Sequence, residues 1–156
     1  MYKKIIISAF NIHTGGGFTL LNEILNNNES AKYFDKLILD ERTRKRFHTL
    51  KLKKVFAKKK IFSRLFKFLF YTSFIDKNKI LFCFNGLPPF FNLKCKVVVY
   101  LQTFYFTETP RSYSFPPFVS LRIFFEKIWF WFFYTNIDEI WVQTNHIKLK
   151  LLKVIK

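Results

Sequence analysis

The segment His13-Thr14-Gly15-Gly16-Gly17 contains the residues whose types and spacing best suit the binding of an anionic ligand. Three consecutive glycines let a ligand approach the backbone without meeting a Cβ atom. The apolar run 5–10 before them is typical of a strand, and the apolar residues of 18–28 share one face of a helix. The start of such a helix offers unpaired N–H groups and the positive end of the helix dipole. We therefore predict a phosphate or another anionic ligand at this segment.

The same glycines allow a second interpretation, in which a tight turn lets the helix pack closely on a sheet. The P-loop motif G-x-x-x-x-G-K-[ST] is absent, and Leu20 stands where G-x-G-x-x-G needs its third glycine. His13 is either a donor to phosphate, an acid or base, or a residue that only shapes the turn. Both interpretations stay open at this stage.

Five apolar runs recur along the chain, and each is followed by polar or turn-forming residues. The runs are 5–10, 37–39, 80–84, 97–101 and 140–142. Unbroken hydrophobicity is typical of strands that are buried on both faces of a parallel sheet. Helical patterns lie between several runs, at about 18–28, 61–74 and 118–135. We therefore predict one α/β domain over 1–156, with a doubly wound, mostly parallel, Rossmann-like sheet. The section 42–55 is a candidate for a further strand, although its period is not clean.

Ligands of doubly wound sheets bind outside the carboxyl ends of the strands. The polar residues that follow the runs should gather at that edge. They are Asn11, Asp40-Glu41, Asn85-Gly86, Gln102-Thr103 and Gln143-Thr144.

The chain carries 27 basic and 10 acidic residues, a net charge of +17, and 23 of its 156 residues are Phe. This excess favours an anionic partner, although a genome poor in G and C also enriches Lys and Phe. Nucleic-acid binding is disfavoured because no helix-turn-helix, zinc-finger or RNP pattern accompanies the charge. Cys83 and Cys95 form neither a metal-site pattern nor a disulfide framework, so we expect no metal, no cofactor and a cytoplasmic location. We also expect no signal peptide, and no run reaches the ~20 apolar residues of a membrane span.

Residues 42–67 include twelve Lys or Arg and no acidic residue. Within 61–74 the apolar side chains Phe62, Leu65, Phe66, Leu69 and Phe70 have helical spacing. This pattern is typical of a basic amphipathic helix in a membrane interface, or of a helix that docks its apolar face on the sheet. The basic residues that would contact the membrane surface are Lys58, Lys59, Lys60, Arg64 and Lys67.

The segment 118–135 is apolar almost all round from Ile128 onward, which predicts a buried helix. In the alternative interpretation, Trp129 and Trp131 lie at the level of lipid headgroups.

These segments resemble a known family when they are taken in order. The run K-K-I-I-I-S-A-F-N-I-H-T-G-G-G-F-T-L-L-N-E-I-L at 3–25 is similar to the start of bacterial group-one glycosyltransferases, the GT-B enzymes of the family-four type. The segments L-I-L-D-E-R, F-N-G-L-P-P-F, V-V-V-Y-L-Q and D-E-I-W-V-Q-T fit the same N-terminal half. The resemblance covers nearly the entire chain.

The resemblance implies two Rossmann-like domains that face each other across a cleft. The N-terminal domain binds an acceptor, either a cell-surface glycan or a lipid-linked one, and the C-terminal domain binds a nucleotide sugar. This chain corresponds to the N-terminal domain alone, so we expect it to be inactive without the donor-binding half. The alternative is a non-catalytic module, a truncated remnant that associates with a membrane or a partner.

The resemblance also assigns site residues but no catalytic residue. Many family members have a histidine after the fourth strand region, where this chain has Gln102-Thr103, so the role of that histidine does not carry over. The implied sites are the donor-phosphate or acceptor loop His13, Thr14, Gly15, Gly16 and Gly17, the acceptor cleft Asn85, Gly86, Gln102 and Thr103, and the interdomain edge Gln143 and Thr144.

Overall fold

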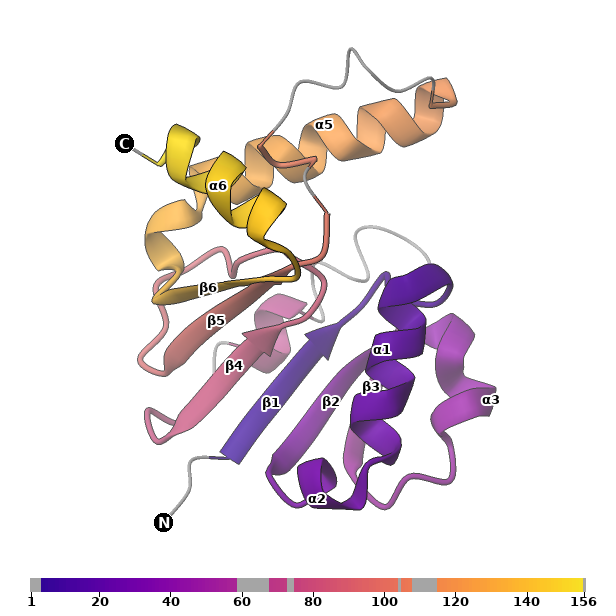
Figure 1. Cartoon of the computed structure of the whole chain (residues 1–156). Helices are drawn as coiled ribbons and strands as arrows, with labels where there is room; N and C mark the ends of the chain where they lie inside the picture. The colour runs from indigo at the N-terminus through magenta and orange to yellow at the C-terminus, as the bar shows by residue number, and fades with distance from the viewer. Residues whose placement is uncertain (1–3, 59–67, 73–74, 104, 108–114, 156) are drawn as a thin grey trace.

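The chain folds around a six-stranded sheet in which every neighbouring pair of strands is parallel (Figure 1). The computed structural model describes residues 4–58, 68–72, 75–103, 105–107 and 115–155. The strand order is β3-β2-β1-β4-β5-β6, so the order reverses between β1 and β4. The strands are β1 (Lys4–Ala9), β2 (Phe34–Asp40), β3 (Lys53–Ala57), β4 (Lys79–Cys83), β5 (Lys96–Leu101) and β6 (Glu139–Val142). The predicted doubly wound α/β fold is confirmed.

Helices connect most of the strands. Figure 1 shows α1 in front of β2 and β3, beside α3. The helical elements are α1 (Gly15–Asn26), α2 (Asn28–Ala31), η1 (Glu41–Thr43), α3 (Arg44–Phe47), α5 (Pro117–Phe132), η3 (Tyr134–Asn136) and α6 (Asn145–Val154). Residues 68–72 are helical as well. Among the described residues, no helix is both long and apolar enough to cross a membrane.

Alternate side chains of the strands pack in two separate hydrophobic cores, one on each face of the sheet. On β1, Ile7 belongs to the core that contains Leu21 and Leu25 of α1. Its neighbour Ile6 belongs to the other core, which contains Phe130 of α5. Because successive strand residues point to opposite faces, α1 and α5 cover opposite sides of the sheet.

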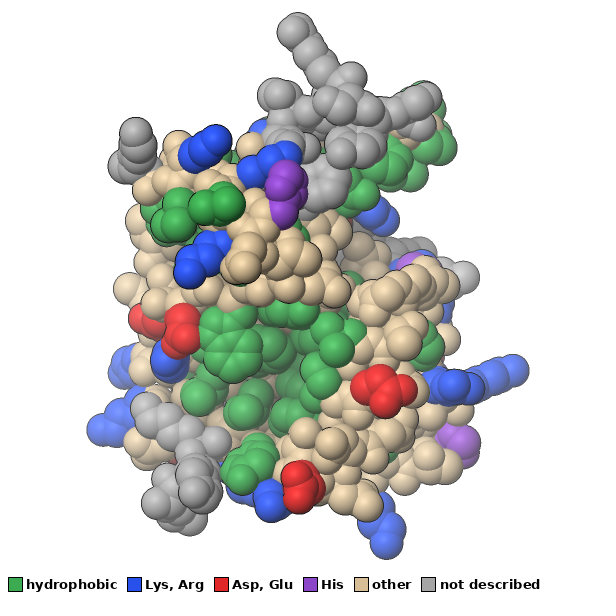
Figure 2. Space-filling view, in the orientation of Figure 1, with side chains coloured by type: hydrophobic (Ala, Val, Ile, Leu, Met, Phe, Trp, Pro, Cys, Tyr) green, Lys and Arg blue, Asp and Glu red, His purple; other side chains and the backbone are tan. Residues whose placement is uncertain are grey.

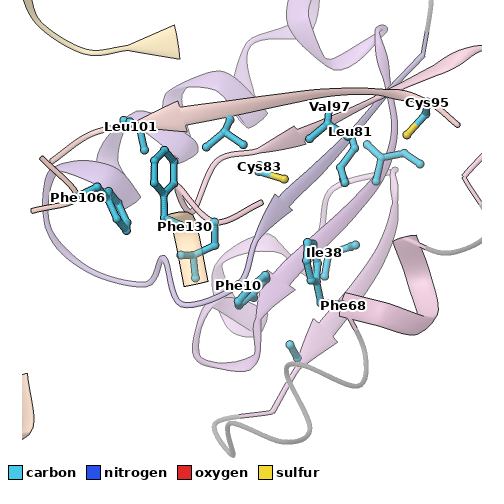
Figure 3. Packing of buried hydrophobic residues seen from close by; sticks show 14 of the residues in the cluster. Phe10, Ile38, Phe68, Leu81, Cys83, Cys95, Val97, Leu101, Phe106 and Phe130 are labelled. Atoms are coloured by element: carbon cyan, nitrogen blue, oxygen red, sulfur yellow. The ribbon is translucent and has the colours of Figure 1, made fainter. Parts of the chain in front are cut away.

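The core on the α5 side is rich in aromatic rings (Figure 3). Phe130 lies with its ring centre 5.0 Å from that of Phe106, and Phe68 lies 5.1 Å from Phe10. Cys83 is fully buried in this core, and burial raises the pKa of its thiol above the usual range. Cys83 therefore behaves as the small buried hydrophobe that the sequence predicted.

Three expectations needed adjustment. The section 42–55 does lead into a strand, β3, but a 3-10 turn and α3 come first. Residues 61–67 and 73–74 of the predicted basic helix lie outside the described residues. In the part that is described, Phe68 is fully buried although it was not in the predicted apolar set, whereas Phe70 is 54% exposed.

The correction to 118–135 is larger. The segment forms α5, but the helix is not buried all round: six of its apolar side chains are each 47–87% exposed. Only Ile123 and Phe130 of α5 are buried. The composition predicted burial because apolar surface is normally covered, and here one side of the helix has no cover among the described residues.

Part of the sheet face on the α1 side, over β4, β5 and β6, is also not covered by a described helix. On the α1 side, Phe82, Tyr100 and Trp141 stand side by side on β4, β5 and β6, with Phe82 5.4 Å from Trp141 and 6.1 Å from Tyr100 between ring centres. Trp141 is 51% exposed. Figure 2 shows hydrophobic side chains gathered in the middle of this face. No helix or strand lies within 84–95, which connect β4 to β5.

An ion pair ties the amino ends of two strands together across β1. Nζ of Lys79 on β4 lies 2.7 Å from Oδ2 of Asp35 on β2. This hydrogen bond lowers the pKa of Asp35 below its usual value, against the opposing effect of burial.

Candidate functional site

The glycine segment forms the first turn of α1, so the helix begins three residues earlier than the apolar pattern indicated. Thr14 before it is extended, with φ −149° and ψ 168°, and its side chain makes no capping hydrogen bond. Gly15 has φ +72°, which favours glycine, and there is open space where a Cβ would stand at Gly15 or Gly16. The predicted arrangement, with glycine N–H groups at a helix N-terminus, is therefore confirmed.

Gln102 brings the ends of β4 and β5 to this helix. Its Nε2 donates to the carbonyl oxygen of Phe84, which follows β4, at 3.2 Å. Its Oε1 lies against Gly17, so a methyl group added at Gly17 would overlap it. A side chain at position 17 would therefore push the end of the Gln102 side chain aside. One predicted cleft residue, Gln102, and one predicted loop residue, Gly17, are in contact.

The junction of β1 and β4, where the strand order reverses, contains unsatisfied polar groups. The backbone N–H groups of Phe84 and Asn85 both donate to the carbonyl oxygen of Ser8, at 2.8 and 3.3 Å. The Ser8 hydroxyl and both polar atoms of the Asn85 side chain are buried and have no hydrogen-bond partner among the described residues. Buried polar groups without a partner cost roughly 1–3 kcal/mol each, so these three atoms mark a place where a water or a ligand could bind. We call Ser8 and Asn85 the β1/β4 junction.

On the other side of β1, a buried carboxylate organises the end of β2. Asp40 is fully buried, and it accepts hydrogen bonds from Nε and Nη2 of Arg42 at 2.7 and 2.8 Å. It also accepts from the backbone N–H groups of Arg42 and Asn11, at 3.0 and 3.1 Å. The hydrogen bond from Arg42 to Asp40 raises the pKa of the guanidinium. We call Asn11, His13, Asp40 and Arg42 the Asp40 cluster.

The Asp40 cluster also fixes His13. Nη1 of Arg42 lies 2.6 Å from Nε2 of His13. Because a guanidinium only donates, Nε2 is assigned as the acceptor, and Nδ1 then carries the proton and faces the carbonyl oxygen of Asn11 at 3.4 Å. Asn11 itself has φ +74°, a left-handed conformation that is uncommon outside glycine. His13 therefore lies in a hydrogen-bonded bend immediately before the glycines.

Arg42 was not among the predicted site residues. Its place directly after the polar pair Asp40-Glu41, at the end of an apolar run, is the signal that could have found it. Bidentate pairing of Arg with a carboxylate is a common and specific contact.

The remaining predicted residues are less closely connected to the glycines. Thr103 follows β5 and is half-buried, and Gly86 has φ +79° in the turn after β4. The backbone N–H of Gln143 donates to the carbonyl oxygen of Leu101 at 3.1 Å, and Oγ1 of Thr144 caps α6 by accepting from Ile147. These last two lie at the carboxyl end of β6, an edge strand.

The predicted membrane-surface residues fall mostly outside the description. Lys58 is exposed directly after β3, at the opposite edge of the sheet from β6. Lys59, Lys60, Arg64 and Lys67 lie outside the described residues.

The site as a whole is an edge at which backbone donors, an amide and a fixed imidazole lie near the point where the strand order reverses. Such an edge suits the binding of a polar or anionic ligand. No protein family, characterised protein or solved structure matches this chain.

Proposed function

We propose that this chain is the acceptor-binding, N-terminal half of a glycosyltransferase. The reaction would transfer a sugar from a nucleotide-sugar donor to a cell-surface glycan or a lipid-linked acceptor, in polysaccharide biosynthesis. The likeness of its sequence segments to GT-B enzymes suggests the reaction class. The site would act at the cytoplasmic surface, peripherally on the inner face of the cell membrane.

One observation carries the proposal: Gln102 contacts both the end of β4 and Gly17 of α1. Donor phosphates in the proposed reaction are negatively charged, and the first turn of α1 offers N–H donors and a positive dipole end to them. The acceptor would lie against the ends of β4 and β5, at Asn85, Gly86, Gln102 and Thr103. The side-chain amide of Asn85 can both donate to and accept from sugar hydroxyl groups, but its polar atoms are buried in the free chain and the acceptor would have to expose them.

The proposed transfer reaction needs a second domain that faces this one across the cleft. The chain would hold and orient the acceptor, while the donor-binding half would supply most contacts to the nucleotide. We assign no acid, base or nucleophile to this chain, because His13 is held by Arg42.

The experiment joins the chain to the reading frame that follows Lys156 in its genome and measures release of nucleoside diphosphate. The donors are a panel of nucleotide sugars, and the acceptors are detergent-solubilised membrane lipids. We expect turnover by the joined protein, none by the 156-residue chain, and a loss of about tenfold or more when Gly17→Leu displaces Gln102.

A matched variant is Gly16→Ala in the joined protein, because open space surrounds that position. It should keep most of the activity. Turnover by the isolated chain would refute the missing-half part of the proposal, and a joined protein with no turnover on the whole panel would refute the transferase assignment.

A further inference from the structure

One side of α5 is apolar and exposed among the described residues. Its members recur at spacings of three and four residues, so they lie along one side of the helix. They are Phe118, Leu121, Phe124, Phe125, Ile128 and Phe132, which are 87, 52, 54, 59, 47 and 76% exposed. We call these six residues the α5 stripe.

The opposite side of α5 is firmly attached to the domain. Phe130 is fully buried, and Nε1 of Trp129 and Nε1 of Trp131 donate to the carbonyl oxygens of Pro88 and Phe106 at 2.9 and 3.0 Å. The helix therefore cannot roll to hide the stripe without breaking these contacts. Both tryptophans are half-buried and give their indole N–H groups to the protein, so the alternative that places them at the level of lipid headgroups stays a prediction.

The stripe contains no charged side chain, and the charges of α5 lie beside it. Arg122 is exposed and pairs with Glu126 at 3.6 Å, and Lys127 is the third charged residue of the helix. Together α5 and α6 carry five basic residues and one acidic one: Arg122, Lys127, Lys148, Lys150 and Lys153 against Glu126. Bulky aromatic side chains flanked by Lys and Arg are typical of helices that lie in a bilayer interface.

Net charge favours an anionic bilayer over a second copy of this chain as the occupant of the stripe. A second copy would bring another +17 chain against the first, and like net charges repel. The surface of a bilayer that contains anionic lipids attracts a basic protein and accepts aromatic side chains below its headgroups. We infer that α5 is a monotopic membrane-binding element, whose Phe-rich stripe inserts into the interface of an anionic bilayer.

The position of α5 connects this inference to the candidate site. Oε1 of Glu126 accepts a hydrogen bond from Nδ2 of Asn11, in the bend at the end of β1, at 3.4 Å. Figure 1 shows the N-terminal end of α5 reaching out on the side toward which the strands point. Glu126 lies on the side of α5 away from the stripe, so α5 contacts the end of β1 with one side and leaves the stripe open on the other. The inference rests on the peripheral membrane location proposed above and names the element that would mediate it, but it does not depend on the transfer reaction.

The test is co-sedimentation of the full chain with vesicles of phosphatidylcholine, with and without phosphatidylglycerol. We expect binding to the anionic vesicles, and replacement of Phe118, Phe125 and Phe132 by Ser should lower the binding constant by about tenfold or more, since each replacement removes a large apolar side chain. The control is Leu149→Ser with Leu152→Ser, which removes two exposed apolar side chains from α6 and should lower binding less than the stripe variant does.

A further variant compares the stripe with the basic segment predicted from the sequence. Replacing Lys58, Lys59, Lys60, Arg64 and Lys67 by Gln should lower binding less than the stripe variant does. Circular dichroism checks that each variant is folded, and sedimentation velocity without lipid reports self-association.

Four results would overturn the inference. They are unchanged binding by the stripe variant, equal binding to neutral and anionic vesicles, a larger loss in the glutamine variant than in the stripe variant, or an oligomer in the wild-type chain that only the stripe variant dissociates. Because the assay uses no nucleotide sugar, its failure would leave the proposed transfer reaction to its own experiment.

Discussion

The two sides of β1 differ at the carboxyl edge of the sheet. On the β2 side, the Asp40 cluster gives its buried carboxylate four hydrogen bonds within the chain. On the β4 side, the β1/β4 junction keeps a hydroxyl and an amide buried with no partner among the described residues. The polar groups on one side of the edge are satisfied within the chain, and those on the other have no partner among the described residues. The comparison predicts opposite responses to mutation.

The largest effect is expected from Asp40→Ala. The change removes the carboxylate that accepts from Nε and Nη2 of Arg42 and from the backbone N–H of Asn11, and breaking such a buried pair costs about 3 kcal/mol. Urea unfolding followed by circular dichroism measures the free energy of unfolding. The control is Glu41→Ala, which removes an exposed partner of Arg44 and should cost less than about 1 kcal/mol. Similar losses in both variants would contradict a structural role for the Asp40 cluster.

On the β4 side we expect the opposite sign. Ser8→Ala removes a buried hydroxyl that no described residue satisfies, and the free energy of unfolding should stay equal or rise by about 1 kcal/mol. The same variant in the joined protein should lose acceptor affinity if the junction binds the acceptor. A destabilisation by Ser8→Ala would mean that the hydroxyl has a partner in the native protein.

Two glycine substitutions with smaller effects test the contact between Gln102 and α1. Gly16→Ala should raise the free energy of unfolding by about 0.5 kcal/mol, because alanine restricts the unfolded chain and meets open space here. Gly17→Ala should bring no such gain, since its methyl group displaces Gln102. In a Gln102→Ala background the two glycine substitutions should become equivalent. A gain from Gly17→Ala in the wild-type background would contradict the close approach.

The last prediction concerns the amino ends of β2 and β4, at the opposite end of the strands from the Asp40 cluster and the β1/β4 junction. The pKa of Asp35 is lowered in the folded chain, so its pair with Lys79 stabilises the fold above the ordinary pKa of about 4. This contribution is lost as the pH falls through the lowered, folded value. When the pH is lowered from neutral to acid, the free energy of unfolding should therefore fall by about 0.5 kcal/mol less in Asp35→Asn than in the wild-type chain. Unfolding at a series of pH values measures it, and parallel curves would contradict the prediction.

Much of the fold could be predicted because five of the six strands contain an unbroken apolar run that ends in polar residues. The glycines also placed the start of a helix correctly, to within three residues. What failed depends on contacts across the chain. Nothing local to 118–135 distinguishes a helix covered on all sides from one with an open stripe, and Phe68 packs against Phe10, which lies far away in sequence.

Part of the candidate site could be predicted because its residues follow the apolar runs that form the strands. Asn85, Gln102 and the glycines follow strands, and the parallel sheet brings such positions to one edge. Arg42 was missed because its importance comes from the burial of its neighbour Asp40 and from the imidazole of His13, which Arg42 meets only when β1 and β2 lie side by side.

The three tryptophans are divided between the faces of the sheet. Trp129 and Trp131 give their indole N–H groups to main-chain oxygens beside one core, whereas Trp141 stands half open on the opposite face, beside Glu139. Intrinsic fluorescence should consequently contain two populations, one of which aqueous iodide quenches readily and one of which it reaches poorly. A molecule that settles on the bare aromatic face would protect the first population, and loosening of α5 would expose the second, so one emission spectrum reports separately on each side of the domain.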